Sequence, residues 1–402
     1  MQDIRKKIAG LKPGDMVFYL TFLFFFNLYF FVTTEFFFEG TKSITGPLLL
    51  LYKVFFTILY SYCFHVVFIQ IERVKDRIIP IALFLVALIY SCKREPDPSG
   101  YLYIIFVFVM LIIASYKKSG RMIMLLCLIS SWAWLIICFL ASRAGIITDL
   151  VDINGRHAFG IVFATDLGCH LFFTAVAVCI LRNGELKKRD YAVLVALLLI
   201  NVLFVRAKIS IICTFLLLLI SVMAPVIRKR SLGNRKKLLL TYGLITGLAF
   251  VFFAVFTIAW SYGYDPSPDV FYNKYGFLNT LRIRLRVGRE AFDNYGITLW
   301  GQNVISNGWT IDSMNDPDYH YFFLDISYVR LLFHNGIAML TAFLFMESLL
   351  QFKFYREKKF FLMGVLAIIA LDMAIEHHMT EMSYNFPLLL LFAETDLNRS
   401  SS

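Results

Sequence analysis

This 402-residue chain has few charged residues and lacks the common local catalytic motifs. Only 17% of its residues are charged, against about 25% in a typical soluble domain, and 59% are hydrophobic. The seven cysteines form no CxxC pair, so neither a disulfide framework nor a zinc motif is indicated. A Gly-rich phosphate loop, GxSxG and HExxH are also absent, which removes the familiar local signatures of nucleotide enzymes, hydrolases and metalloproteases.

Long apolar runs take the place of those motifs. These runs recur from one end of the chain to the other and are about 16–25 residues long, enough to cross a bilayer core of ~30 Å. The mean hydropathy of the chain is +0.70. We therefore predict an all-α polytopic membrane protein in which residues 1–402 form one integral membrane domain. The twelve transmembrane helices that we expect are 16–38, 46–71, 78–92, 101–116, 121–142, 158–181, 190–204, 206–227, 238–260, 322–350, 360–375 and 384–395.

The positions of the basic residues predict an orientation. Lysine and arginine concentrate in alternate short connections, and by the positive-inside rule those connections face the cytoplasm. Both termini are then expected in the cytoplasm, and the first apolar run is expected to stay as a span because it is too long for a signal-peptide core. The net charge of +11 is thereby explained by loops beside a membrane, and we expect no nucleic-acid partner.

One long polar connection, 261–321, is expected between the ninth and tenth spans, on the outward side. Its aromatic residues, among them Trp300 and Trp309, argue against disorder, and long connections are usually functional. On a helix, three of its four arginines share one face while Arg284 lies elsewhere. That pattern fits an amphipathic helix on the membrane surface or a site for an anion such as phosphate. The four arginines are Arg282, Arg284, Arg286 and Arg289.

Other arginines also lie on the predicted outward side, against the usual bias. Arg206 stands at the junction of the seventh and eighth spans, where it either snorkels to the interface or binds an anion. Arg330 is spaced i, i+4 from His334 within a span, so the pair is either an internal brace between helices or a functional site. Arg156 precedes the sixth span.

Histidine and aspartate near the tenth span are the candidate general bases. His320 and Asp325 lie at the predicted outer rim with Tyr328, although the surrounding aromatic residues also fit an interfacial belt. We expect no metal ion at His377 and His378, because adjacent histidines on a helix point to different faces. An enzyme that transferred sugars at a site on the outer face would have no supply of nucleotide sugars, so its glycan donor would be lipid-linked.

Four stretches carry a resemblance to a known family: NGRHAFGIVFATDLG (154–168), VRAKISII (205–212), LRIRLRVGREAFDNYGITLWGQN (281–303) and DISYVRLLFHNGI (325–337). Their order and spacing resemble those of the Wzy-type polymerases of O-antigen, capsular polysaccharide and exopolysaccharide repeat units, which are relatives of the O-antigen ligases. The third stretch resembles the family's outer-loop arginine motif leading to a Trp/Phe-Gly pair, here Trp300-Gly301. The fourth resembles an acidic or histidine position followed by Ser-Tyr and then Gly.

The resemblance implies a GT-C-like membrane fold and an inverting glycosyl transfer without metal or cofactor, at the outer face of the bacterial cytoplasmic (inner) membrane. Undecaprenyl-pyrophosphate-linked glycans would be donor and acceptor, with a flippase and a chain-length regulator as further partners. Ligation of finished glycan to another acceptor, and flipping of a lipid-linked sugar, stay open as alternatives.

The resemblance also implies roles for individual residues. Arg206 and Arg284 match phosphate-binding arginines of the family. Either Asp325 or His320 would be the base, because many relatives have histidine where this chain has Asp325. The remaining candidates for binding the substrate are Arg156, Arg282, Arg286, Arg289, Tyr328 and Arg330.

Overall fold

The described part of the chain is helical throughout. The computed structural model describes residues 13–40, 46–93, 103–152, 155–231, 236–265, 279–308 and 319–395; within these ranges there is no strand, only isolated bridges such as Thr34 with Ile161. The predicted all-α class is confirmed. The elements are α2 (Pro13–Phe31), α3 (Glu35–Gly40), α4 (Gly46–His65), η1 (Val66–Gln70), α5 (Val74–Lys93), α6 (Ile104–Ala114), α7 (Gly120–Arg143), α8 (Ala164–Arg182), α9 (Lys188–Ile200), η2 (Asn201–Val205), α10 (Lys208–Ser231), α11 (Lys236–Gly247), α12 (Ala249–Tyr262), α14 (Asn279–Asn294), α15 (Ser327–Arg330), η5 (Leu331–Asn335), α16 (Gly336–Arg356), α17 (Phe360–Asp372), η6 (His378–Thr380) and η7 (Phe386–Leu391).

Membrane-type helices are fewer than the twelve predicted. Six described helices are long and apolar enough to cross a membrane, and α11 with α12, bent by 44°, would make a seventh. α6 and α17 are apolar but have only 11 and 13 residues, which is about 17–20 Å of helix against a bilayer core of ~30 Å. α5 and α9 have charged residues in their first turns, so their apolar stretches are shorter than the helices.

Several predicted span boundaries differ from the structure, and the junction of the seventh and eighth spans is a turn. The first span stops at Phe31 because the chain turns at Thr33, whose carbonyl accepts a hydrogen bond from Val162 N–H (3.0 Å), and α3 follows. The tenth begins at Ser327 instead of residue 322. The seventh and eighth spans form a hairpin, because Arg206 adopts a left-handed conformation (φ 54°) between η2 and α10.

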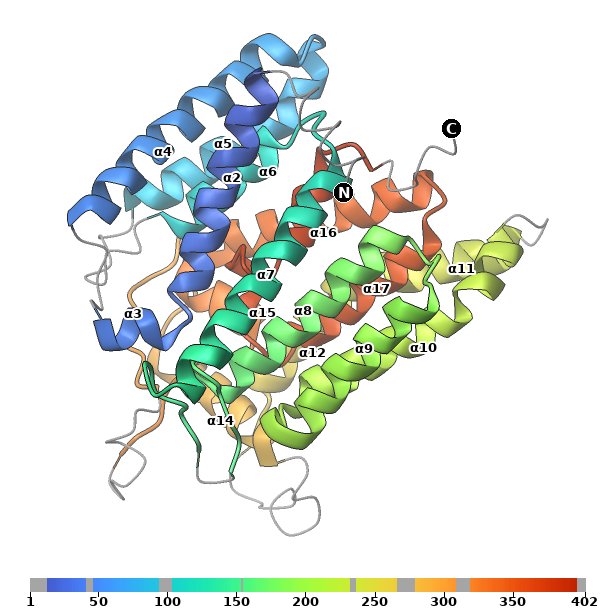
Figure 1. Cartoon of the computed structure of the whole chain (residues 1–402). Helices are drawn as coiled ribbons and strands as arrows, with labels where there is room; N and C mark the ends of the chain where they lie inside the picture. Colours follow the sequence, from blue (N-terminus) through green and yellow to red (C-terminus); the bar gives the residue numbers. More distant parts are fainter. Residues whose placement is uncertain are drawn as a thin grey trace.

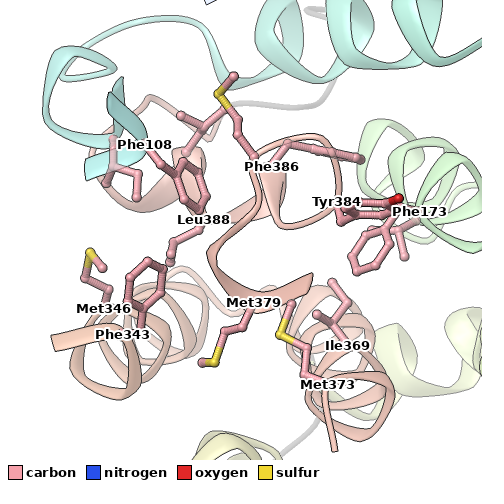
Figure 2. Close-up of a cluster of buried hydrophobic side chains, with 14 of the residues drawn as sticks. Phe108, Phe173, Phe343, Met346, Ile369, Met373, Met379, Tyr384, Phe386 and Leu388 are labelled. Carbon is pink, nitrogen blue, oxygen red and sulfur yellow. The ribbon is translucent and has the colours of Figure 1, made fainter. Parts of the chain in front are cut away.

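The predicted twelfth span, 384–395, is wrong as an α-helix. It contains η7, a 3₁₀ helix of six residues with Pro387 in its first turn, where the ring supplies no N–H donor. Residues 382–391 are buried, and irregular backbone is tolerated at membrane depth only inside protein. Figure 2 shows Tyr384, Phe386 and Leu388 of this segment, with Met379 shortly before it, surrounded by Phe108 of α6, Phe173 of α8, Phe343 and Met346 of α16, Ile369 of α17 and Met373 directly after α17.

The core of the bundle lies between two flanks of helices. α4 and α5 lie on one flank and α9, α10 and α11 on the other, with α8 and α17 between them (Figure 1). α6 is surrounded by protein, since every residue from Ile105 to Ala114 is buried. α10 packs against both α8 and α17, and at Gly168 of α8 an added Cβ would lie 2.3 Å from the Cβ of Ala207. The two helices therefore touch nearly backbone to backbone at the start of α10.

The bundle has two chemically different ends. At the end that we call the basic end, Lys118 pairs with Asp15 (2.5 Å), and the ammonium of Lys353 donates to the carbonyls of Leu390 (2.8 Å) and Ala393 (2.5 Å). At the opposite end, α14 meets the residues that follow α17. The segment 376–394 runs between these two ends, because Glu394 N–H donates to the carbonyl of Lys118 (2.8 Å).

Several predicted features lie outside the described residues. They are parts of the long connection (266–278 and 309–318), including Trp309, and the termini expected in the cytoplasm (1–12 and 396–402).

Candidate functional site

The arginine helix α14 is present, and it turns Arg284 inward. Arg284, Val287 and Ala291 are buried on one face together with Gly288, the i, i+3, i+4, i+7 spacing of a helix face. This face packs on α12, so closely that a Cβ on Gly288 would lie 2.6 Å from Ser261 Oγ. The apolar face of α14 is thus covered by protein, while Arg286 stays exposed.

The guanidinium of Arg284 joins three separate parts of the chain. Nε donates to the carbonyl of Ile375 (2.7 Å), Nη2 donates to Glu376 Oε1 (3.0 Å), and Nε lies 3.6 Å from Asp325 Oδ2. Burial by itself would lower the pKa of Arg284, but the carboxylates of Glu376 and Asp325 hold that pKa above its usual value. The arrangement is a buried, hydrogen-bonded bridge between one cation and two anions.

Asp325 is held in position from both sides. Tyr321 donates its hydroxyl hydrogen to Asp325 Oδ2 (3.0 Å), and Asp325 Oδ1 lies 4.0 Å from His377 Nδ1. Burial and the nearby Asp325 carboxylate raise the pKa of Tyr321, so its hydroxyl remains a donor. Two residues later, Ser327 N–H donates to the carbonyls of Met373 (3.1 Å) and Glu376 (3.2 Å), which joins the start of α15 to the end of α17.

Two histidines and two further carboxylates complete the site. His378 Nδ1 lies 3.3 Å from Glu381 Oε2, and its Nε2 lies 3.7 Å from Asp166 Oδ1 of α8. His377 Nε2 lies 3.7 Å from the other oxygen of Glu381. We define the polar cluster as Asp166, Arg284, Tyr321, Asp325, Glu376, His377, His378 and Glu381.

The two adjacent histidines carry opposite charge preferences. Burial lowers the pKa of His377 well below its usual value, assisted by the neighbouring His378. Burial opposes protonation of His378 as well, but Glu381 and Asp166 outweigh it and raise the pKa of His378 to about 9. Burial also raises the pKa of Glu376, and Arg284 offsets only part of that rise. The acidic residues therefore draw positive charge to His378.

A stack of rings fixes the orientation of His378. Its ring centroid lies 3.8 Å from that of Tyr384, which lies 4.2 Å from that of His170, which lies 4.0 Å from that of Phe30. Thr33 Oγ1 lies 2.9 Å from His170 Nε2 and so contacts the third ring of the stack. Because these rings come from α2, α8 and the segment after α17, the stack joins all three at the cluster end.

The glycines of the third and fourth stretches meet in the structure. At Gly301 (φ 83°) an added Cβ would overlap the carbonyl of His334, and at Gly336 (φ 82°) it would overlap the backbone of Gly301 and Leu299. This close approach lets Ile337 N–H and Ala338 N–H donate to the carbonyls of Thr298 (3.1 Å) and Leu299 (3.0 Å). The first donors of α16 are satisfied in this way, which fixes the loop after α14.

Eight of the ten predicted site residues lie outside the polar cluster, and four of these have partners of their own elsewhere: Tyr328, His320, Arg289 and Arg156. Tyr328 is fully buried and donates its hydroxyl hydrogen to the carbonyl of Ala370 (3.0 Å). The other three make ion pairs closer to the surface. They are His320, 64% exposed, with Glu290 (2.6 Å); Arg289 with Asp293 (2.7 Å); and Arg156 with Asp152 (2.5 Å).

The remaining predicted arginines surround the cluster end. The guanidinium of Arg330 stacks on Phe323 (4.7 Å), whose ring makes an edge contact with His377 (5.1 Å). Arg206 is exposed at the turn before α10, next to the contact between Ala207 and Gly168. Arg282 is half-buried on α14.

Asp166 and the segment 376–381 are the functional candidates that the sequence analysis did not select. Asp166 is the one carboxylate in the apolar run 158–181, and an ionisable residue inside such a run is itself a sign of function. The histidine pair was set aside on the assumption of an α-helix. The chain instead makes turns at 373–377 followed by the short η6, and the two ring centroids lie 4.2 Å apart.

Comparison with known proteins gives no match: no family model, no curated protein and no solved structure matches the chain.

Proposed function

We propose that the chain is a membrane glycosyltransferase that polymerises oligosaccharide repeat units carried on undecaprenyl pyrophosphate. The observation that carries the proposal is Asp325, a carboxylate held by Tyr321 and Arg284 at one end of an apolar helical bundle. A positioned carboxylate beside a membrane suits a substrate whose lipid stays in the bilayer while its sugar reacts. A GT-C-like architecture and an outward-facing site at the bacterial cytoplasmic membrane belong to the same proposal.

In the proposed reaction, Asp325 takes the proton from a hydroxyl group of the acceptor sugar. The hydroxyl oxygen forms a bond to the anomeric carbon of the donor, and the bond from that carbon to the pyrophosphate oxygen breaks with inversion. The lipid pyrophosphate leaves with the bonding electron pair. Tyr321 and Arg284 hold the carboxylate in place for the transfer, which is the positioning that proton transfer requires.

The arginines have different roles in this proposal. Arg284 already donates to Ile375 and Glu376, so we assign it the positioning of Asp325. Arg206 and Arg286 are exposed, Arg206 before α10 and Arg286 on α14, and we assign them the pyrophosphate. Guanidinium groups match phosphate oxygens in paired hydrogen bonds and stabilise the negative charge that develops on the leaving group.

The test is elongation of lipid-linked repeat units by the purified chain in liposomes, followed as a ladder of products on a gel. We expect Asp325→Asn to slow elongation by roughly 10²–10⁴-fold, the usual contribution of a general base. Asp293→Asn is the matched control, because Asp293 pairs with Arg289 and is 52% exposed. If Asp325→Asn elongates normally and His320→Gln does not, the base is His320. If both elongate normally, the mechanism is wrong.

The same assay separates the two alternatives. A ligase would join finished glycan to a different acceptor without lengthening the repeat units. A flippase would move lipid-linked repeat units across the liposome bilayer and leave their length unchanged. Either result would replace the polymerase proposal.

A further inference from the structure

The polar cluster contains residues that have no role in the proposed glycosyl transfer. Asp166, His377, His378 and Glu381 do not act on the sugar in that reaction, yet His378 and Asp166 are almost fully buried. Within the cluster, the carboxylates of Asp166, Asp325, Glu376 and Glu381 outnumber the one guanidinium bonded to them, Arg284. Buried carboxylates in excess call for compensation, by a proton such as that on His378 or by a bound cation, because an unpaired buried charge is costly.

The two histidines present a nitrogen each to a common space. Glu381 lies behind both rings, with one oxygen 3.3 Å from His378 Nδ1 and the other 3.7 Å from His377 Nε2. The nitrogens left over, His378 Nε2 and His377 Nδ1, are buried and have no hydrogen-bond partner among the described residues, although His377 Nδ1 lies 4.0 Å from Asp325 Oδ1. A carboxylate behind an imidazole, with the opposite nitrogen directed at a cation, is the usual outer-shell arrangement of histidine metal ligands.

Asp166 supplies the third donor. Asp166, His377 and His378 each place one potential ligand atom within 4.8 Å of the other two, and His378 Nε2 is 3.7 Å from Asp166 Oδ1. Ligands about 2.0–2.2 Å from a tetrahedral zinc ion lie roughly 3.5 Å apart, so small side-chain shifts would close the set. Imidazole favours zinc and its transition-metal neighbours, whereas magnesium and calcium favour oxygen ligands.

We propose that Asp166, His377 and His378 bind one divalent cation of the zinc class, with Glu381 orienting both imidazoles. The ion joins α8 to the segment after α17 and offsets the excess negative charge beside Asp325. The proposal goes beyond the glycosyl transfer and does not rest on it, because metal content is measured without any substrate.

The test measures zinc retained by the full chain in nanodiscs after incubation with Zn²⁺ and removal of free ion by gel filtration. We expect about one zinc per chain, retained in the presence of Mg²⁺, and a loss of at least tenfold in His378→Gln and Asp166→Asn. Glu381→Gln should weaken binding by roughly 10–100-fold, as outer-shell substitutions do. The matched control is His157→Gln, because His157 pairs with Asp149 outside the cluster and should not affect retention.

Substitution by Co²⁺ gives a second measurement that needs no variant. Nitrogen and oxygen ligands should give visible absorption without a strong thiolate charge-transfer band. A thiolate band would overturn this ligand set in favour of Cys169, which with Glu376 and His378 forms the neighbouring alternative triad. Retention of no zinc above the His378→Gln background would overturn the site altogether, leaving His378 itself as the compensating cation.

Discussion

Replacing Arg284 with methionine tests the central bridge of the site most directly. The change keeps a long side chain on α14 but removes the cation that lies 3.0 Å from Glu376 and 3.6 Å from Asp325. At an effective dielectric constant of ~20, these two contacts correspond to a gross attraction of about 5 kcal/mol each. Part of that attraction offsets the cost of burying the charges, and breaking a buried pair from one side typically costs ~3–5 kcal/mol. We expect Arg284→Met to lower the free energy of unfolding by that amount.

The measurement is unfolding in mixed micelles titrated with a denaturing detergent, followed by labelling of thiols. Arg289→Met is the control, because the contacts of Arg289 are largely exposed: an ion pair with Asp293 and a hydrogen bond to the carbonyl of Tyr262. Exposed contacts of this kind should contribute only about 1 kcal/mol. Unfolding should expose the buried thiols to the reagent, while Cys92 reacts from the start. The buried thiols are those of Cys63, Cys127, Cys138, Cys169, Cys179 and Cys213.

A double variant separates the bridge from a role in phosphate binding. If Glu376 is left unpaired by Arg284→Met, then adding Glu376→Gln should recover at least about 1 kcal/mol, a coupling of the size seen for residues in contact. Were Arg284 instead a ligand of the lipid pyrophosphate, the single variant would fold normally and lose only donor binding. A loss of stability below about 1 kcal/mol, equal to that of Arg289→Met, would refute the bridge.

Two further predictions concern the framework around the site, both measured by the same unfolding assay. Gly336→Ala should lower the free energy of unfolding by roughly 1–3 kcal/mol from backbone strain alone, because φ 82° and ψ 172° suit only glycine. The new Cβ would also overlap Gly301. The control is Gly247→Ala, which has open space around it and should leave stability unchanged or slightly raised. Lys353→Met should lower the free energy of unfolding by about 1–3 kcal/mol, because buried carbonyls of residues 390–393 lose their donor. It should also speed proteolysis at these residues. The control is Lys188→Met at an exposed helix start, which should change the free energy of unfolding by less than about 0.5 kcal/mol.

Arg284 shows what the helical spacing within one segment can predict. Its position apart from the other three arginines follows from helical spacing within one segment. The structure adds that Arg284 is buried, whereas the other three arginines are not. Asp325 was selected for its chemistry, its place at the predicted outer rim and its match to the family's acidic or histidine position. Its nearness to Arg284 depends on how α14 packs against α12 and on the hydrogen bonds that join α15 to α17, and no spacing in the sequence encodes those contacts.

The proximity of Asp166 to His377 and His378 shows what local sequence patterns cannot predict. More than 200 positions of sequence separate Asp166 from the histidines, and only the packing of α8 beside the end of α17 brings them together. The twelfth predicted span was wrong for a related reason. An apolar run shows that a segment is buried, but it does not distinguish an α-helix from a 3₁₀ turn inside other helices.

The buried course of residues 376–394 has a consequence for how the protein is made. An α-helix can enter a bilayer alone because its backbone groups are satisfied within it, whereas a chain with only short 3₁₀ turns cannot. Its hydrogen-bonding partners include Ser115 and Lys353, and its apolar neighbours lie on α6, α8, α16 and α17. All of them are synthesised earlier. This segment can therefore be buried only among partners that precede it in the chain, and its packing among them brings His377 and His378 to Asp166.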